Sequence, residues 1–341
     1  MEILIRGTPG EGGGGMKDGG PARLVAILNS FNRRELLRDA LASLAGALAD
    51  CPFGAAIVVF DAGSTDGSLE WLAEYREERP RTSVQVILRE EGADGSLSAG
   101  VNAAARFSLE KFPDLEWLFL FETDNWIGGA TPVLAAVNLL YSVPDLAAAG
   151  FTVKKRGGED AGFGCAFPTV TQFILGQRIT NLLRLDTPRI GQWQVAGNVR
   201  WAPCDIVYTS PLLIRRKAWE QIGGLDARSF PFCDMDVDWS WRASREGWRM
   251  AVVETSEIVH DNIGVASEWS AGRVVNFHRA RLRLLSKYRK MPLLLVKILL
   301  LCRHLFELFM LILASWCLDN PRRILRDRWV LLKSALWSYE R

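Results

Sequence analysis

The sequence lacks the cysteine spacings that mark disulfide-rich and zinc-binding proteins. Its six cysteines form no C-x-x-C pair and show no zinc-ligand spacing. Histidine is scarce as well, with only three in 341 residues. No apolar run in residues 1–21 has the length of a secretory signal. We therefore expect a protein of the reducing cytosol, in which the thiols pack as small hydrophobic groups.

The glycine motifs of two large nucleotide-binding classes are also missing. A dinucleotide-binding dehydrogenase needs G-x-G-x-x-G directly after its first strand, whereas this chain has NSFNRRE at residues 29–35. The absence of a G-x-x-x-x-G-K-[ST] segment excludes a P-loop NTPase. The densest glycines lie before the first strand, and we expect residues 1–22 to be disordered.

A long uncharged apolar run is the third absence. The stretch 291–318 is apolar but is interrupted by Lys297, Arg303, His304 and Glu307, whereas a membrane-spanning helix needs about 20 mostly uncharged residues. Residues 278–341 contain 14 Lys or Arg and 4 Asp or Glu, a net charge of +10 in a chain of +2. We expect residues 291–341 to form a basic, apolar helical tail lying on the inner face of a membrane.

Short apolar runs and helical patterns alternate from residue 23 onwards. The runs at 24–28, 56–60, 84–88 and 117–121 predict buried strands. Between the first two, leucines at helical spacing predict a helix with a capping box of Asn32 and Glu35, and residues 68–78 predict another helix. The alternation predicts an α/β domain over residues 23–290, with a mostly parallel central sheet flanked by helices.

The alternation is broken in residues 151–203, which mix glycine, proline, charge and aromatic side chains. We expect this stretch to be an inserted lobe, with Trp193 and Trp201 either buried or lining a binding groove. Regular structure is expected to return at residues 206–214.

Acidic side chains follow two of the predicted strands, at the edge where such sheets bind ligands. Asp61 and Asp66 come after the second strand, and Glu122 and Asp124 after the fourth. A carboxylate at a strand end can accept a ring N–H or bind a ribose hydroxyl. Alternate carboxylates can hold Mg²⁺ or Mn²⁺ against a diphosphate. Each pair is equally typical of a polar turn.

A second acidic group opens a predicted helix farther along, at Asp234, Asp236 and Asp238, and is followed by Trp239 and Trp241. An aspartate here could take a proton from an acceptor hydroxyl, with aromatic rings beside it to stack on a sugar. The alternative is an acidic helix start stabilised by the helix dipole. His260, at the end of an apolar run, is a candidate metal ligand, although a lone histidine is more often structural.

Seven segments, taken in order, resemble the inverting family 2 glycosyltransferases of the GT-A fold, and especially the rhamnosyltransferase-like cell-envelope enzymes. The segments are VAILNSFNR at 25–33, VVFDAGSTDGS at 58–68, SLSAGVNAAA at 96–105, LFLFETDN at 118–125, LLIRRKAWEQIGGLD at 212–226, DMDVDWSWR at 234–242 and IVHDN at 258–262. The resemblance implies metal-assisted transfer of a sugar from a UDP- or dTDP-sugar to a hydroxyl of a glycan or lipid-linked acceptor.

The resemblance also implies a role for individual residues. Asp236 matches the catalytic base, with Asp234 as the alternative, and Asp124 and His260 match the site of a Mg²⁺ or Mn²⁺ ion. The implied donor-binding set is Asn29, Asp61, Asp66, Asn102, Glu122 and Asp124. Residues 151–203 are placed on the acceptor side, together with Asp234, Asp238, Trp239 and Trp241. The acidic triplet has Glu122 where the family has Asp, so the metal assignment depends more on Asp124.

Two other interpretations stay open. Met235 and Glu122 depart from the family pattern and are compatible with a catalytically degenerate scaffold that binds a nucleotide sugar on the same fold. A glycosyltransferase acting on a polyprenyl phosphate is the other, although such relatives often have clear spanning helices. In each case we expect a cytoplasmic protein at the inner face of the cell membrane, with no nucleic-acid partner.

Overall fold

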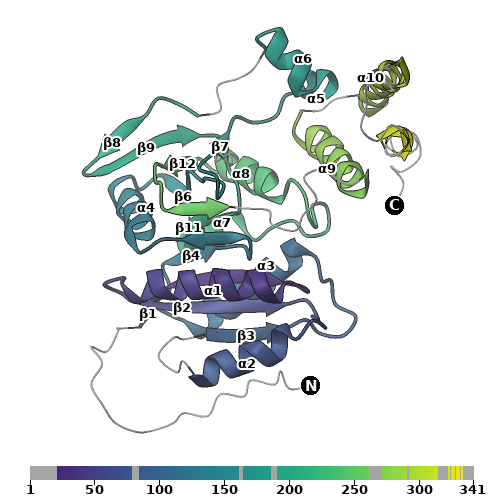
Figure 1. The fold of residues 1–341 in the computed structure, drawn as a ribbon. Helices are drawn as coiled ribbons and strands as arrows, with labels where there is room; N and C mark the ends of the chain where they lie inside the picture. The colour runs from purple at the N-terminus through teal and green to yellow at the C-terminus, as the bar shows by residue number, and fades with distance from the viewer. Residues whose placement is uncertain are drawn as a thin grey trace, which may run out of the picture.

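The computed structural model describes residues 21–78, 84–160, 164–185, 190–260, 271–289 and 292–313, and parts of 322–332. The expectation of a disordered N-terminus therefore falls almost wholly outside the described residues. In the described part, a nine-stranded sheet of order β3-β2-β1-β4-β11-β6-β12-β9-β8 forms the centre, with helices on both faces (Figure 1).

The first half of the sheet is parallel. Its strands β1, β2, β3 and β4 pair in parallel register, and the predicted strands and helices are confirmed. The elements are β1 (Ala22–Ser30), α1 (Arg34–Ala49), β2 (Gly54–Asp61), α2 (Ser68–Glu78), β3 (Val84–Leu88), α3 (Leu97–Lys111) and β4 (Trp117–Leu120).

The second half of the sheet is mixed, because β11 runs antiparallel between β4 and β6. Two small ribbons, β10 with β7 and β13 with β5, lie outside the main sheet. The elements are β5 (Asn125–Ile127), α4 (Thr131–Ser142), β6 (Leu146–Phe151), β7 (Gly164–Cys165), α5 (Val170–Leu175), α6 (Gln177–Leu182), β8 (Gln194–Ala196), β9 (Val199–Cys204), β10 (Ile206–Val207), β11 (Leu212–Arg215), α7 (Arg216–Ile222), α8 (Met235–Arg245), β12 (Arg249–Val253), β13 (Ile258–His260), α9 (Ala271–Arg289) and α10 (Leu293–Leu313). The structure predicted at 206–214 is thus two short strands in different sheets.

Alternation along β1 explains why its sequence is apolar throughout. Leu24, Ala26 and Leu28 face the core under α1, while Val25 and Ile27 face the opposite core under α3. All five are at most 2% exposed. A strand covered on both faces has no polar side, so it appears in the sequence as a continuous apolar run.

The predicted capping box at Asn32 and Glu35 is wrong. Helix α1 begins after Arg33, which makes no side-chain cap. The Asn32 side chain instead accepts a hydrogen bond from the backbone N–H of Thr65, and Asp66 accepts one from the N–H of Arg34. The cap of α1 therefore comes from the loop after β2, which is remote in the sequence.

The expectation of an inserted lobe at 151–203 is wrong for its last part. Strands β8 and β9 form the edge of the main sheet, where β9 pairs with β12. Trp201 is 4% exposed in the core, and Trp193 packs under the Arg200 guanidinium. The rest includes α5 and α6, which Figure 1 shows beside α10.

The C-terminal region is helical, as predicted. Helix α9 packs on α8 and is followed by α10. Among the described helices, none combines the length and the apolar character needed to cross a membrane.

Candidate active site

A pocket of about 520 Å³ opens at the carboxyl ends of β1, β2 and β4, the edge at which the sequence predicts a ligand. Asn29 and Arg33 come from the end of β1, Arg89 follows β3, and Glu122 follows β4. Two phenylalanine rings on its wall, Phe31 and Phe232, are more than half exposed. The pocket thus offers cations, an amide and open aromatic faces to one ligand.

Asn29 lines this pocket and has a buried side-chain oxygen. Its side-chain N–H donates to the carbonyl of Leu97 at 2.8 Å, which holds the start of α3 against β1. In the described part of the chain, Oδ1 has no hydrogen-bond partner. A side chain at Gly100 would approach this oxygen to 2.7 Å, so glycine is required there. The unused acceptor suits an N–H or O–H of a ligand.

Glu122 lines the pocket, and Asp124 and Asp236 lie close enough for their charges to act on it. Glu122 accepts a hydrogen bond from the Thr209 hydroxyl at 3.0 Å. Burial, together with the negative charges of Asp124 and Asp236, raises the pKa of Glu122 to about 7. Burial also raises the pKa of Asp236 to about 6, with a contribution from Asp234. The site is therefore short of positive charge.

The pairing of β13 with β5 places His260 opposite Asn125, next to Asp124. The Asn125 side-chain N–H donates to Ser210 Oγ at 2.8 Å, so its Oδ1 is the acceptor facing His260 Nδ1 at 2.9 Å. This network assigns the proton of a neutral His260 to Nδ1 and leaves a lone pair on Nε2. A backbone register thus sets the tautomer.

Asp124 and His260 fit a divalent cation in part. Asp124 is 8% exposed, and its Oδ1 lies 3.5 Å from His260 Nδ1 without a hydrogen-bond partner among the described residues. Among all residues that the structure describes, no group of three or more His, Cys, Asp or Glu side chains is placed to hold a metal. Such a pair suits a cation whose other ligands are phosphate oxygens and water.

Asp234 is already paired. Its carboxylate receives two hydrogen bonds of 2.8 Å from Arg281 of α9, and its side chain is 4% exposed. Asp234 also adopts the left-handed conformation, with φ of 59°, that begins α8. Both of its carboxylate oxygens are thus engaged by the protein. This leaves Asp236 as the acid of α8 that no side-chain cation holds in the described structure.

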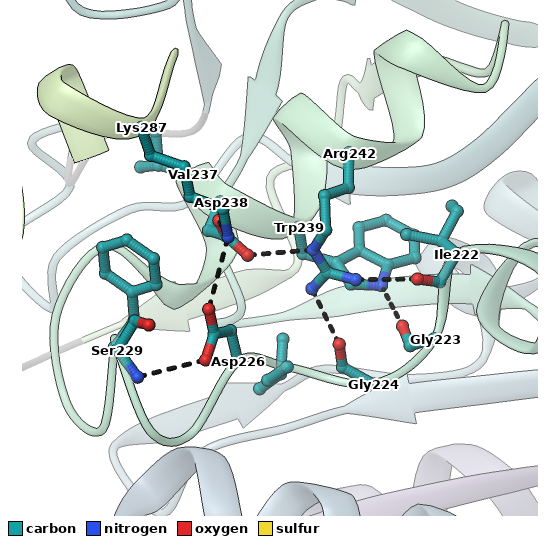
Figure 2. A network of polar contacts seen from close by, with 12 residues as sticks. Ile222, Gly223, Gly224, Asp226, Ser229, Val237, Asp238, Trp239, Arg242 and Lys287 are labelled. Atoms are coloured by element: carbon teal, nitrogen blue, oxygen red, sulfur yellow. Dashed lines mark hydrogen bonds and ion pairs between the residues drawn. The ribbon is translucent and has the colours of Figure 1, made fainter. Parts of the chain in front are cut away.

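Asp238 is the centre of a buried network, and its predicted acceptor-side position is wrong. The residue is 0% exposed, and it accepts hydrogen bonds from Arg242, Lys287 and Tyr288. Arg242 also donates to the carbonyls of Ile222 and Gly224, as Figure 2 shows. The network joins α7, α8 and α9.

The tryptophans after Asp238 pack in the core and do not face a ligand. Trp239 is 1% exposed and donates its indole N–H to the carbonyl of Gly223 at 3.0 Å. Trp241 is stacked between Phe167 and Tyr288, with ring centroids 4.3 and 4.5 Å away. The prediction of stacking surfaces for a sugar at these two positions is therefore wrong.

Three predicted donor-binding residues act within the fold. Asp61 is 0% exposed, and its carboxylate accepts hydrogen bonds from the backbone N–H groups of Gly63 and Ser64 and the Ser64 hydroxyl. Asp66 caps α1 and α2. Asn102 bonds both the N–H and the carbonyl of Leu225. These contacts support the polar-turn interpretation for both aspartates.

Sequence reasoning missed several residues of the site. Arg33 lies 3.7 Å from Asp124, and Asn125 binds His260. Both are adjacent to motifs that were recognised, so position after a strand could have indicated them. Thr209 and Ser210 lie in residues 206–214, where regular structure was expected, and the sequence there has no signal for a loop that enters the site.

The chain was compared with known families and structures. Residues 26–128 match the family model described as Glycosyl transferase family 2. A comparison with curated protein sequences gives no match.

Solved structures show a similar fold. A mannosyltransferase from Pyrobaculum calidifontis, PcManGT in complex with GDP-Man and Mn²⁺, is 15% identical with a TM-score of 0.55; the alignment covers 95% of this chain and 91% of that one. TarS of S. aureus is 14% identical with a TM-score of 0.50 over 82% of this chain. GalNAc-T7 with UDP, GalNAc and Mn²⁺ is 11% identical with a TM-score of 0.51 over 77%. The match spans only 42% of TarS and 48% of GalNAc-T7.

Proposed function

We propose that this protein transfers a sugar from a nucleoside-diphosphate donor to a hydroxyl with inversion, on the premise that residues 26–128 match glycosyltransferase family 2 and that the fold is GT-A. The observation that carries the proposal is the gathering of Glu122, Asp124 and Asp236 beside an open pocket at the carboxyl edge of the sheet. Such a site can bind a diphosphate on one side and deprotonate a hydroxyl on the other.

Asp236 is the proposed base. It takes the proton of the acceptor hydroxyl while that oxygen attacks the anomeric carbon and the diphosphate leaves from the opposite face. One displacement inverts the anomeric centre. Its pKa of about 6 leaves the carboxylate ionised at neutral pH while keeping it more basic than an exposed aspartate. Asp234 is the weaker candidate, since Arg281 holds both of its oxygens.

Asp124 and His260 would hold a Mg²⁺ or Mn²⁺ ion, which would neutralise the charge of the leaving diphosphate. The orphan oxygen of Asp124 and the lone pair on His260 Nε2 support this assignment. The Mn²⁺ in the structures of PcManGT and GalNAc-T7 is compatible with it. Glu122, beside them, would bind the donor.

The donor is proposed to lie in the 520 Å³ pocket. Asn29 Oδ1 would accept from its nucleoside or sugar, Phe31 or Phe232 would stack on its base, and Arg33 would face its phosphates. We favour UDP- and dTDP-hexoses or deoxyhexoses. The acceptor is proposed to be a glycan or lipid-linked hydroxyl in cell-envelope polysaccharide synthesis, reached by a protein lying on the cytoplasmic face of the membrane.

Calorimetric titration of UDP, dTDP and GDP, with and without Mn²⁺, tests the donor site. We expect one diphosphate to bind with a clear dependence on the metal and to lose that dependence in Asp124→Ala. NMR analysis of the transferred sugar then tests the mechanism, because retention of configuration would exclude a single displacement. Metal-dependent binding without turnover for any donor and acceptor hydroxyl would instead favour the scaffold interpretation. Failure of all three diphosphates to bind would remove the donor assignment.

A further inference from the structure

Helix α10 has its apolar side chains outside and its charged side chains inside. Every exposed side chain described from residue 294 to 313 is apolar, including Leu294 at 72%, Phe306 at 60% and Phe309 at 56% exposure. Three of the four residues that interrupt the apolar run face the protein instead. Of these, His304 is 1% exposed, and Arg303 and Glu307 are half-buried. This is the reverse of the ordinary amphipathic helix.

The inner charges of α10 are neutralised within the protein. Arg303 donates to the carbonyls of Phe173 and Ile174 at the end of α5, and to Glu307 four residues on. Arg328 also donates to Glu307, at 2.6 Å. Although burial opposes ionisation, His304, Arg303 and Arg328 lower the pKa of Glu307 to about 2. The charges that argue against a spanning helix thus fix α10 to the body and leave its outer face uncharged.

A second segment, more than a hundred residues earlier, extends this face. Helix α5 packs against α9 and α10 through a small core that contains Phe173, Leu285 and Val296. Helix α6 follows it directly, and Figure 1 shows α5, α6 and α10 together at one end of the molecule. Leu182 at the end of α6 is 81% exposed and Leu183, directly after it, is 55% exposed, so this end of the molecule carries further exposed apolar side chains.

We propose that these two segments form one lipid-docking surface that inserts into an anionic monolayer. We call it the outer apolar surface, and its principal members are Leu182, Leu183, Leu294, Ile298, Phe306 and Phe309. Large exposed apolar side chains gathered at one end of a molecule mark an interaction site. The inference stands on these contacts and does not depend on the proposed transfer reaction.

The charge around the surface favours a lipid occupant. Arg184 lies exposed between Leu183 and Leu185, and Arg322 and Arg326 are exposed in the segment whose Arg328 contacts α10. Basic side chains beside inserted apolar ones are attracted to anionic headgroups. Because its inner face is packed on α5 and α9, α10 lies along the monolayer and does not cross it.

Flotation of the full-length protein with vesicles tests the proposal. The vesicles are phosphatidylcholine alone, or phosphatidylcholine with about one third phosphatidylserine. We expect Leu182→Asp and Phe306→Asp each to lower the vesicle-bound fraction about five-fold or more, because a charge must then enter the monolayer. The matched control is Val195→Asp on β8, which is 71% exposed but lies at the far edge of the sheet and is expected to bind as the native protein does.

Each other outcome overturns part or all of the proposal. Native binding by Leu182→Asp would remove α6 from the surface, and equal binding to neutral vesicles would remove the anionic headgroup. If the native protein does not bind vesicles but forms a dimer that Leu182→Asp and Phe306→Asp disrupt, the surface is a contact between two copies. Since all three positions are exposed, thermal unfolding of each variant is expected to match the native protein, and this separates loss of binding from loss of fold.

Discussion

Arg281 of α9 binds Asp234 through two hydrogen bonds of 2.8 Å, and Asp234 stands two positions before Asp236 at the start of α8. The pair neutralises one of two neighbouring carboxylates. It also fixes the left-handed residue from which α8 begins, with φ of 59°. Arg281 therefore positions the proposed base without contacting the reacting atoms.

Replacing Arg281 is expected to change both stability and the pH profile. Arg281→Ala leaves the Asp234 carboxylate buried without a cation, a loss of about 3–5 kcal/mol. The uncompensated charge of Asp234 also raises the pKa of Asp236 further, so the acid limb of kcat/KM moves to higher pH. Arg281→Lys keeps the charge and should shift the limb less. If Arg281→Ala is less stable but the acid limb of its kcat/KM profile does not move, Arg281 has a structural role only.

The native acid limb itself is expected near pH 6. The proposed base acts as a carboxylate, and burial raises the pKa of Asp236 to about 6. Activity should therefore be full above this pH and fall about ten-fold per pH unit below it. Asp236→Asn should lower kcat by about 10²–10⁴-fold while leaving donor affinity unchanged. The exposed control Asp114→Asn should have no effect.

Glu122 also titrates near neutrality, so its contribution must be separated. Its pKa is raised to about 7 by burial and by neighbouring carboxylates. If Asp236 sets the acid limb, Glu122→Gln should keep that limb or move it slightly lower, because one negative neighbour is removed. Disappearance of the limb in Glu122→Gln would transfer the role of base to Glu122.

The sequence predicted the parallel half of the sheet because its strands are buried on both faces, as in residues 24–28. It also predicted several residues that meet at the site, since the carboxyl ends of β1 and β4 lie side by side. Glu122 and Asp124 follow from that rule, whereas Asn29 was implied by the family resemblance. The edge strand β8 was missed because its burial is partial and its residues lack a strong apolar pattern.

The roles of Asp61 and Asp238 could not be predicted, because the partners that decide them are not in the motif. The Asp61 carboxylate accepts hydrogen bonds from its own loop, and the sequence of such a loop looks the same as that of a ligand-binding site. Asp238 is held by Lys287 and Tyr288, about fifty residues away on α9. When the partner of a carboxylate lies on a helix far away in the sequence, the residues around that carboxylate do not show that it is paired.

Two asparagines offer a matched test of the donor pocket. Asn29→Ala removes the buried acceptor Oδ1 and one hydrogen bond to α3, so donor affinity should fall about ten-fold together with a stability loss of about 1 kcal/mol. Asn102→Ala removes two hydrogen bonds to Leu225 and should lower the stability of the fold. The molecules that remain folded should bind the donor with native affinity. Calorimetric titration and urea unfolding measure both. Equal affinity losses would mean that Asn29 acts only through the fold.

Two aspartates test how burial determines the value of an ion pair. Asp238 is 0% exposed and bonds Arg242, Lys287 and Tyr288, whereas Asp145 forms a two-point pair with Arg249 in which both side chains are about half exposed. Asp238→Asn removes the buried counter-charge of Arg242 and leaves Lys287 with Asp226 alone, and should cost about 3–5 kcal/mol. Asp145→Asn should cost about 1 kcal/mol or less, because water screens that pair. Urea unfolding at pH 7 compares them. Because the Asp238 network anchors α8, kcat should also fall in Asp238→Asn and stay native in Asp145→Asn. Equal losses of stability in the two variants would show that burial does not strengthen the Asp238 network.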